Sequence, residues 1–275
     1  MSERSIETQT EFVLANVIDR VAVITLNRPE RRNALAQAML EGLERALVDA
    51  ETSKDVGCLV LTGAGGAFCA GGDVKAMAGQ EGGRAGGGGI DAAIHRQRLQ
   101  QRGTAGRIYQ MPKPVIASLP GAAAGAGLSL ALACDLRIAA ERAVLLTAFA
   151  NVGFSGDYGG TFFMTQLVGS AKARELYYLS DRIDAREAER LGLVNRVVPD
   201  EKLEAETMEI ASRLAHGPSV AYRYMKENLN RAIGGDMRDC MDLEATHHVH
   251  TSLTEDHRNA VKAFVEKKSP VFKGR

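Results

Sequence analysis

Two runs of β-branched and other apolar residues, joined around the polar pair Asp19 and Arg20, fill residues 12–26. This pattern predicts a β-hairpin. Residues 33–50 then carry apolar side chains at helical spacing, which predicts a helix. Residues 56–62 are apolar almost without interruption, as is typical of a strand buried on both faces.

A similar order of elements returns further along the chain. The sequence there predicts a strand over 114–119, a turn of small residues over 121–127, a helix over 128–134 and a strand over 136–139. Repetition of strand, glycine turn and helix at this pitch predicts an α/β fold of stacked ββα units rather than one flat sheet.

From residue 171 onward the pattern is helical. The expected helices cover residues 172–179, 185–191, 201–216, 219–233, 237–251 and 255–267. No linker precedes this region. We therefore expect a ββα core over 1–200, with 201–275 as a helical annex to the same domain.

Residues 79–90 hold seven glycines in twelve positions. So many glycines make an ordered backbone costly, and the stretch predicts a mobile surface loop. A phosphate-binding loop is the alternative. It is disfavoured because neither a preceding strand nor a following Lys-Ser/Thr pair is present.

Composition excludes several classes of protein. Thirty-four basic residues balance thirty-four acidic ones, so net charge gives no attraction to nucleic acid or to an anionic membrane. No apolar run reaches the ~18 residues of a membrane span, and the polar N-terminus does not resemble a secretory signal. These features predict a cytoplasmic protein.

Cysteines and histidines show no metal-binding or catalytic pattern. The four cysteines lie far apart, and we expect reduced core thiols at Cys58, Cys69, Cys134 and Cys240. The six histidines fit neither a metal site nor a Ser-His-Asp triad. Three of them, His247, His248 and His250, crowd one predicted helix, and we expect them on its exposed surface. No metal is predicted.

Two glycine-rich turns carry the candidate chemistry. Residues 68–73 and 121–127 each lead into a predicted helix, whose first N–H groups have no partner inside the helix. Small residues let a ligand approach these groups closely. If both turns face one pocket, they form an oxyanion hole. Asp73 is placed to cap the short helix that follows the first turn.

The sequence resembles the crotonase (enoyl-CoA hydratase/isomerase) superfamily. The matching segments are ITLNRPERRNAL (24–35), LVLTGAGGAFCAGGDVKAM (59–77), KPVIASLPGAAAGAGLSLALACDLRIAA (113–140), GLVNRVVP (192–199) and AFVEKKSPVFKGR (263–275). The resemblance implies a spiral of ββα units and a C-terminal helical region that forms trimers, often hexamers. It also implies an oxyanion hole made by the backbone N–H groups of Gly72 and Ala126.

The same resemblance implies residues that contact the acyl-CoA substrate. Arg32 matches a position near the CoA phosphates, and Phe264 and Lys267 match a C-terminal pair that contacts CoA, often across subunits. The alternative for Arg32 and Lys267 is a charged side chain that is exposed to solvent and does not contact CoA. The other candidate substrate or CoA contacts are Ala70, Asp73, Lys75 and Phe149. CoA arrives as part of the substrate, so no separate cofactor is implied.

Two departures from the family pattern bear on the reaction. Hydratases of this family use two glutamates, and the corresponding residues here are Ser129 and Phe149, the second on a predicted strand. Neither side chain exchanges protons near neutral pH, so two-glutamate hydration is not expected. Asp157 is the acid that remains.

Asp157 matches an aspartate found in three relatives. The ring-epoxide isomerase of phenylacetyl-CoA degradation is the closest, since it too has Ala-Phe where Ala148 and Phe149 stand, although it usually has proline at the position of Gly156. The 4-chlorobenzoyl-CoA dehalogenase has its histidine base at the position of Arg102 and needs a tryptophan that this chain lacks. Dienoyl-CoA isomerase has two further carboxylates.

We therefore predict an acyl-CoA isomerase in which Asp157 is the single acid and base. The alternative role for Asp157 is a helix cap. An enoyl-CoA hydratase or thioester hydrolase, with Asp157 activating water, is the alternative enzyme. A non-catalytic homologue that binds acyl-CoA or RNA is the alternative of another class, and neutral net charge disfavours RNA.

Overall fold

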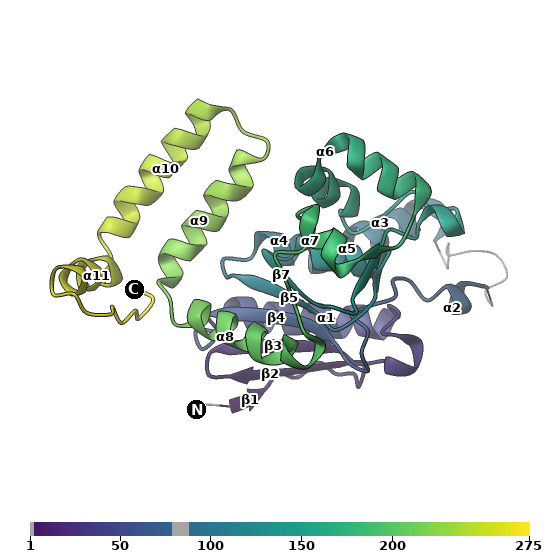
Figure 1. Ribbon diagram of the computed structural model, residues 1–275, viewed down its shortest axis with the longest axis horizontal. Coiled ribbons are helices and arrows are strands. Elements are labelled where there is room, and N and C mark those ends of the chain that lie inside the picture. The colour runs from purple at the N-terminus through teal and green to yellow at the C-terminus, as the bar shows by residue number, and fades with distance from the viewer. Residues whose placement is uncertain (1–2, 79–87) are drawn as a thin grey trace.

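A computed structural model describes residues 3–78 and 88–275 of the chain. It contains a seven-stranded sheet that is antiparallel at its first three strands and parallel beyond them (Figure 1). In spatial order its strands are β1 (Glu3–Ser5), β2 (Val13–Ile18), β3 (Val21–Leu26), β4 (Cys58–Gly63), β5 (Val115–Leu119), β7 (Leu136–Ala140) and β10 (Arg196–Val198). A separate three-stranded sheet consists of β6 (Ala123–Ala124), β8 (Val144–Leu146) and β9 (Ile183–Asp184). The expectation of more than one sheet is thus confirmed.

Helices cover the sheets and extend beyond them. Those of the core are α1 (Gln37–Thr52), α2 (Val74–Ala78), α3 (Gly89–Gln101), α4 (Arg107–Gln110), α5 (Ala126–Ala133), α6 (Gly160–Leu179), α7 (Ala185–Arg190) and α8 (Leu203–Ala215). The C-terminal helices are α9 (Ser219–Ala232), α10 (Met237–Ser252) and α11 (Glu255–Val265), which stand away from the sheet in Figure 1. Short turns of 3-10 or π-helix join the elements at Pro29–Arg31, Arg102–Gly106, Ala150–Val152 and Asp200–Lys202.

The predicted hairpin is confirmed, with Asp19 and Arg20 in the left-handed region at its turn. The helix expected over 33–50 begins only at Gln37. The reason lies in Asn33, which has a positive φ of 57°. Its buried side chain donates to the carbonyls of Ala64, Ala67 and Phe68 instead of extending a helix. This contact ties the chain before α1 to the first glycine-rich turn.

Two other helices differ from the prediction. Residues 79–87 of the predicted glycine loop lie outside the described residues, but Gly89 and Ile90 already belong to α3. This helix was not predicted because it has no buried residue and hence no apolar stripe. Helix α6 begins at Gly160 rather than near residue 171, and Gly169, with a φ of 76°, interrupts its helical geometry.

The cysteines are all free, and three are buried as predicted, whereas Cys240 is only half-buried. The prediction of exposed histidines holds for His248 and His250 but is wrong for His247. His247 is buried between α9 and α10, where its ring stacks on Tyr224 with centroids 4.2 Å apart.

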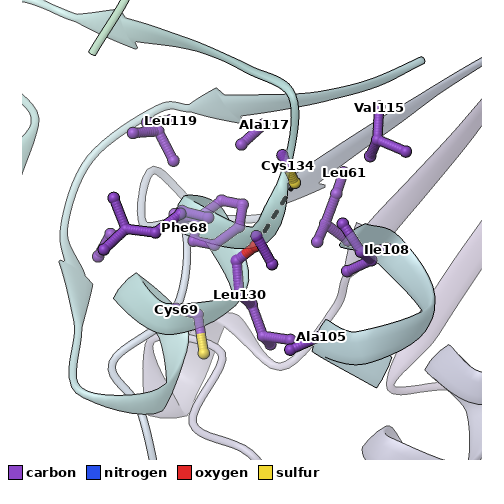
Figure 2. Close-up of a cluster of buried hydrophobic side chains, with 14 of the residues drawn as sticks. Leu61, Phe68, Cys69, Ala105, Ile108, Val115, Ala117, Leu119, Leu130 and Cys134 are labelled. Atoms are coloured by element: carbon purple, nitrogen blue, oxygen red, sulfur yellow. Dashed lines mark hydrogen bonds between the residues drawn. The ribbon is translucent and has the colours of Figure 1, made fainter. Parts of the chain in front are cut away.

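A continuous apolar core lies behind both glycine-rich turns. Figure 2 shows Phe68 and Cys69, which lead into the first turn, together with Leu130 of α5, which follows the second. Side chains of the central sheet pack on them, namely Leu61, Val115, Ala117 and Leu119. The core thus fixes both turns against the same sheet. Within the described part of the chain, no helix is long and apolar enough to cross a membrane.

Candidate active site

The two glycine-rich turns run side by side. The N–H groups of Phe68 and Cys69 both donate to the carbonyl of Ala122, at 3.0 and 3.1 Å, and the Ala124 N–H donates to the Cys69 carbonyl at 2.9 Å. Gly71 has a φ of 87°, and a β-carbon placed there would lie 2.8 Å from the Ala124 oxygen. Glycine is therefore required at Gly71 for the turns to approach this closely.

Gly72 and Ala126 stand at the point where the turns meet. Ala126 is the first residue of α5, so its N–H belongs to the set that has no acceptor within the helix. Across residues 3–78 and 88–275, no hydrogen bond from the Gly72 or Ala126 N–H is found. Both residues line one cavity, so their two N–H groups are suited to bind an oxyanion there.

This cavity has a volume of about 90 Å³ and walls that are mainly apolar. Its lining residues are Leu35, Leu40, Ala70, Gly71, Gly72, Val74, Gly125, Ala126, Ala148, Phe149, Val152, Phe154, Asp157 and Tyr158. Asp157 is the one carboxylate in this described set. A carboxylate and two helix-turn N–H groups therefore share a small apolar chamber.

Asp157 lies in the turn that precedes α6 and is half-buried. Its backbone carbonyl accepts a hydrogen bond from the Gly160 N–H at 3.0 Å, but the N-cap residue of α6 is Gly159. The charge of Asp157 affects the pKa values of two neighbours, the half-buried Tyr177 and the buried Cys69. Burial, and then the Asp157 carboxylate, raise the pKa of Tyr177. Burial raises the pKa of the Cys69 thiol to about 12, and Asp157 adds to this shift.

Gln101, at the end of α3, holds the residue next to Asp157. Its side-chain oxygen accepts a hydrogen bond of 3.0 Å from the Tyr158 N–H. Tyr158 has a φ of 49°, a conformation that non-glycine residues seldom adopt. The contact therefore stabilises an otherwise costly backbone beside the carboxylate. No local pattern could have revealed Gln101, because it lies far from Tyr158 in the sequence on a helix that was not predicted.

The candidate substrate contacts of the first turn have different environments. Asp73 caps α2 as predicted, accepting from the Ala76 N–H at 3.1 Å, and it also pairs with Arg28 at 2.8 Å. These two contacts lower the pKa of Asp73. Lys75 is exposed on α2. The contacts of Asp73 and Lys75 with substrate stay predictions.

Arg32 and Ala70 are linked by a backbone hydrogen bond of 2.9 Å, from the Ala70 N–H to the Arg32 carbonyl. Ala70 lines the cavity, and Arg32 is exposed. Arg32 therefore lies on the part of the chain that leads to the cavity rim. Its contact with CoA phosphates stays a prediction.

Phe264 and Lys267 do not line this cavity. Phe264 is on α11 and is 85% exposed, and Lys267 follows the same helix. In Figure 1, α11 and α2 stand at opposite ends of the molecule. A shallow apolar hollow surrounds Phe264, formed with Ala260, Val261, Lys268 and Pro270. The chain does not bring this pair to its own cavity, and their contact with CoA stays a prediction.

Ser129 and Phe149 replace the two hydratase glutamates. Ser129 is buried in α5, where its hydroxyl donates to the Gly125 carbonyl at 3.3 Å. Phe149 lines the cavity, but it lies beyond the end of β8 rather than on a strand, at the start of a 3-10 turn. The expected strand ends early because Ala148, with a φ of 61°, leaves the extended conformation. No group of metal-binding side chains occurs in the described ranges.

Known proteins match nearly the whole chain. The sequence profile described as "Enoyl-CoA hydratase/isomerase" matches residues 17–275. The 1,2-epoxyphenylacetyl-CoA isomerase of Escherichia coli is 35% identical over 265 residues, which cover 96% of this chain and 99% of that protein.

Solved structures agree with the sequence matches. An enoyl-CoA hydratase from Bacillus anthracis superimposes with a TM-score of 0.88 at 34% identity, covering 96% of this chain and all of the other. An enoyl-CoA hydratase from Polaromonas also gives a TM-score of 0.88, at 31% identity, with 95% and 99% of the two chains covered.

Proposed function

The chain belongs to the enoyl-CoA hydratase/isomerase family, and within it we propose that the protein is an acyl-CoA isomerase with Asp157 as its single acid and base. The fold is the α/β crotonase fold, and enzymes of this superfamily act on acyl-CoA. The observation that supports the isomerase most directly is that, among the described residues, Asp157 is the one carboxylate lining the cavity shared with Gly72 and Ala126.

The proposed reaction begins when the thioester carbonyl accepts hydrogen bonds from the Gly72 and Ala126 N–H groups. Negative charge that develops on this oxygen is stabilised by fixed donors, each contributing roughly 3–4 kcal/mol. Asp157 removes a proton from the α- or γ-carbon, and the electron pair of that C–H bond becomes part of the enolate. Asp157 then returns the proton to another carbon, which moves the double bond without loss or gain of atoms.

Two features support isomerisation over hydration. Ser129 and Phe149 supply no carboxylate, so the two-group water mechanism has no counterpart here. One carboxylate suffices for a proton shuttle, because the conjugate acid formed in the first step is the donor of the second. We propose that its reaction resembles that of the ring-epoxide isomerases, and the 35% identity to the E. coli isomerase is compatible with this proposal.

A hydratase is the second candidate, because the similar solved structures carry that name. In that case Asp157 would activate water. Incubation with a panel of CoA thioesters, followed by mass spectrometry, separates the two functions. Isomerisation leaves the substrate mass unchanged, hydration adds one water, and hydrolysis releases free CoA. A product with added water from crotonyl-CoA at ordinary enzymatic rates, about 10 per second, contradicts the isomerase.

We also propose that the protein assembles as a trimer or hexamer through its C-terminal helices. Helices α9, α10 and α11 expose large apolar side chains, among them Leu229, Met237 and Leu253. Exposed apolar surface of this kind marks interaction sites. A second subunit there would also supply Phe264 and Lys267, which this chain keeps far from its own cavity. The cytoplasmic location stays a prediction.

A further inference from the structure

Behind the cavity wall, the ring of Phe149 stacks on the ring of Tyr177. Their centroids are 5.9 Å apart and the planes differ by 10°. Phe149 lines the cavity, whereas Tyr177 comes from α6 and stands behind it. We call these two residues the aromatic pair.

The aromatic pair lies between the second glycine-rich turn, which carries Ala126, and the turn that carries Asp157. A β-carbon placed on Gly125, next to Ala126, would lie 3.8 Å from the nearest Phe149 ring atom. One placed on Gly156, next to Asp157, would lie 3.3 Å from the Tyr177 ring. The pair thus fills the space from the oxyanion turn to the turn of the carboxylate.

The hydroxyl group of Tyr177 is also enclosed by neighbouring residues. A β-carbon placed on Gly160 would lie 2.6 Å from the Tyr177 hydroxyl and 2.2 Å from the Ser129 hydroxyl. Both hydroxyls therefore converge on the first residue of α6, where only glycine leaves room for them. This fit fixes the Tyr177 ring, and the stack in turn fixes Phe149.

We propose that Tyr177 is a positioning residue that determines the type of reaction, by holding Phe149 where it keeps water away from the β-carbon of the acyl chain. The proposal rests on the proposed function, because it explains why the enolate is reprotonated without addition of water to that carbon. Active sites that exclude water suppress side reactions of their intermediates.

Hydration would use the same groups with one added water. Asp157 would take a proton from water, the hydroxide oxygen would bond to the β-carbon, and the resulting enolate would take the proton back at the α-carbon. This step needs a water molecule placed against the β-carbon. The aromatic pair fills the space behind the cavity wall between Gly125 and Gly156, which is the space that we infer such a water would need.

The test replaces Tyr177 and measures hydration of crotonyl-CoA by mass spectrometry. Tyr177→Leu removes the stacked ring and opens space behind Phe149, so hydration should rise by about tenfold or more over the wild type. Tyr177→Phe keeps the ring and should hydrate as slowly as the wild type. Tyr178→Leu is the matched control, since its side chain is 75% exposed, and it should change nothing.

Unchanged hydration in a folded Tyr177→Leu variant, or an equal rise in Tyr178→Leu, overturns the proposal. If Tyr177→Leu does not fold by circular dichroism, Phe149→Leu opens the same space from the cavity side and should give the same rise. Proton exchange between crotonyl-CoA and D₂O, measured on the wild type in parallel, reports on the proposed function separately. Absent exchange in the wild type contradicts the isomerase, while the hydration rates still decide the role of Tyr177.

Discussion

The ammonium group of Lys226 on α9 lies 2.8 Å from the carboxylate of Asp135, which stands between α5 and β7. The same ammonium donates to the carbonyls of Ile108 and Lys113, at 3.0 and 3.1 Å. Asp135 also accepts from the Val115 N–H at 2.7 Å. A buried cation thus joins the C-terminal helices to the core, close to the helix that begins with Ala126.

Lys226→Met should destabilise the protein strongly. The substitution leaves Asp135 without its countercharge and the Ile108 and Lys113 carbonyls without their donor, and such a loss costs about 1–3 kcal/mol. Denaturant unfolding monitored by circular dichroism measures the change. Lys202→Met, at an exposed position, is the control and should change the free energy of unfolding by no more than about 0.5 kcal/mol. A loss below about 1 kcal/mol in Lys226→Met would show that the pair does not hold the helices.

Gln101→Ala should lower isomerase turnover by about tenfold or more, because a small displacement of a catalytic group is costly. The variant loses the acceptor for the Tyr158 N–H and so loosens the turn that carries Asp157. Binding of crotonyl-CoA should change little, since Gln101 does not line the cavity. Steady-state kinetics and calorimetry test the two effects, with Gln97→Ala on the same helix as control. Equal turnover in the two variants would exclude a positioning role.

The sequence predicted the parts of the site that depend on local pattern. The roles of Gly72, Ala126 and Asp157 follow from the resemblance to the crotonase superfamily, and the fold brings all three to one cavity. Gln101 and Tyr177 were missed because their roles depend on contacts between distant segments. The late start of α1 was missed for the same reason, since Asn33 bonds to carbonyls of the first turn rather than to its neighbours.

Lys113 should make stability depend on pH in the alkaline range. Burial lowers the pKa of its ammonium from 10.5 to about 8 in the folded protein. Between these values the unfolded chain binds more protons than the folded one, so the free energy of unfolding should rise with pH. The buried thiols lower the stability of both proteins alike in this range, so unfolding measured from pH 7 to 10.5 should show a difference, wild type minus Lys113→Met, that rises with pH. A difference between them that stays constant across the range would contradict the lowered pKa.

The assembly should be a trimer or hexamer of the 29.5 kDa chain. The apolar side chains exposed on α9, α10 and α11 become buried when subunits associate, which favours association. Light scattering at micromolar concentrations measures the mass directly. A monomer mass throughout would refute the assembly and remove the route by which Phe264 and Lys267 reach a neighbouring cavity.

The role of Asp157 is tested most directly by the exchange of crotonyl-CoA γ-protons with D₂O in Asp157→Asn. Asparagine keeps the size of the side chain but cannot take up the proton. The variant should therefore bind crotonyl-CoA yet exchange ~10²–10⁴-fold more slowly than the wild type. Asp181→Asn, at an exposed position, should exchange at the wild-type rate. Wild-type exchange in a folded Asp157→Asn variant that still binds crotonyl-CoA would contradict the mechanism.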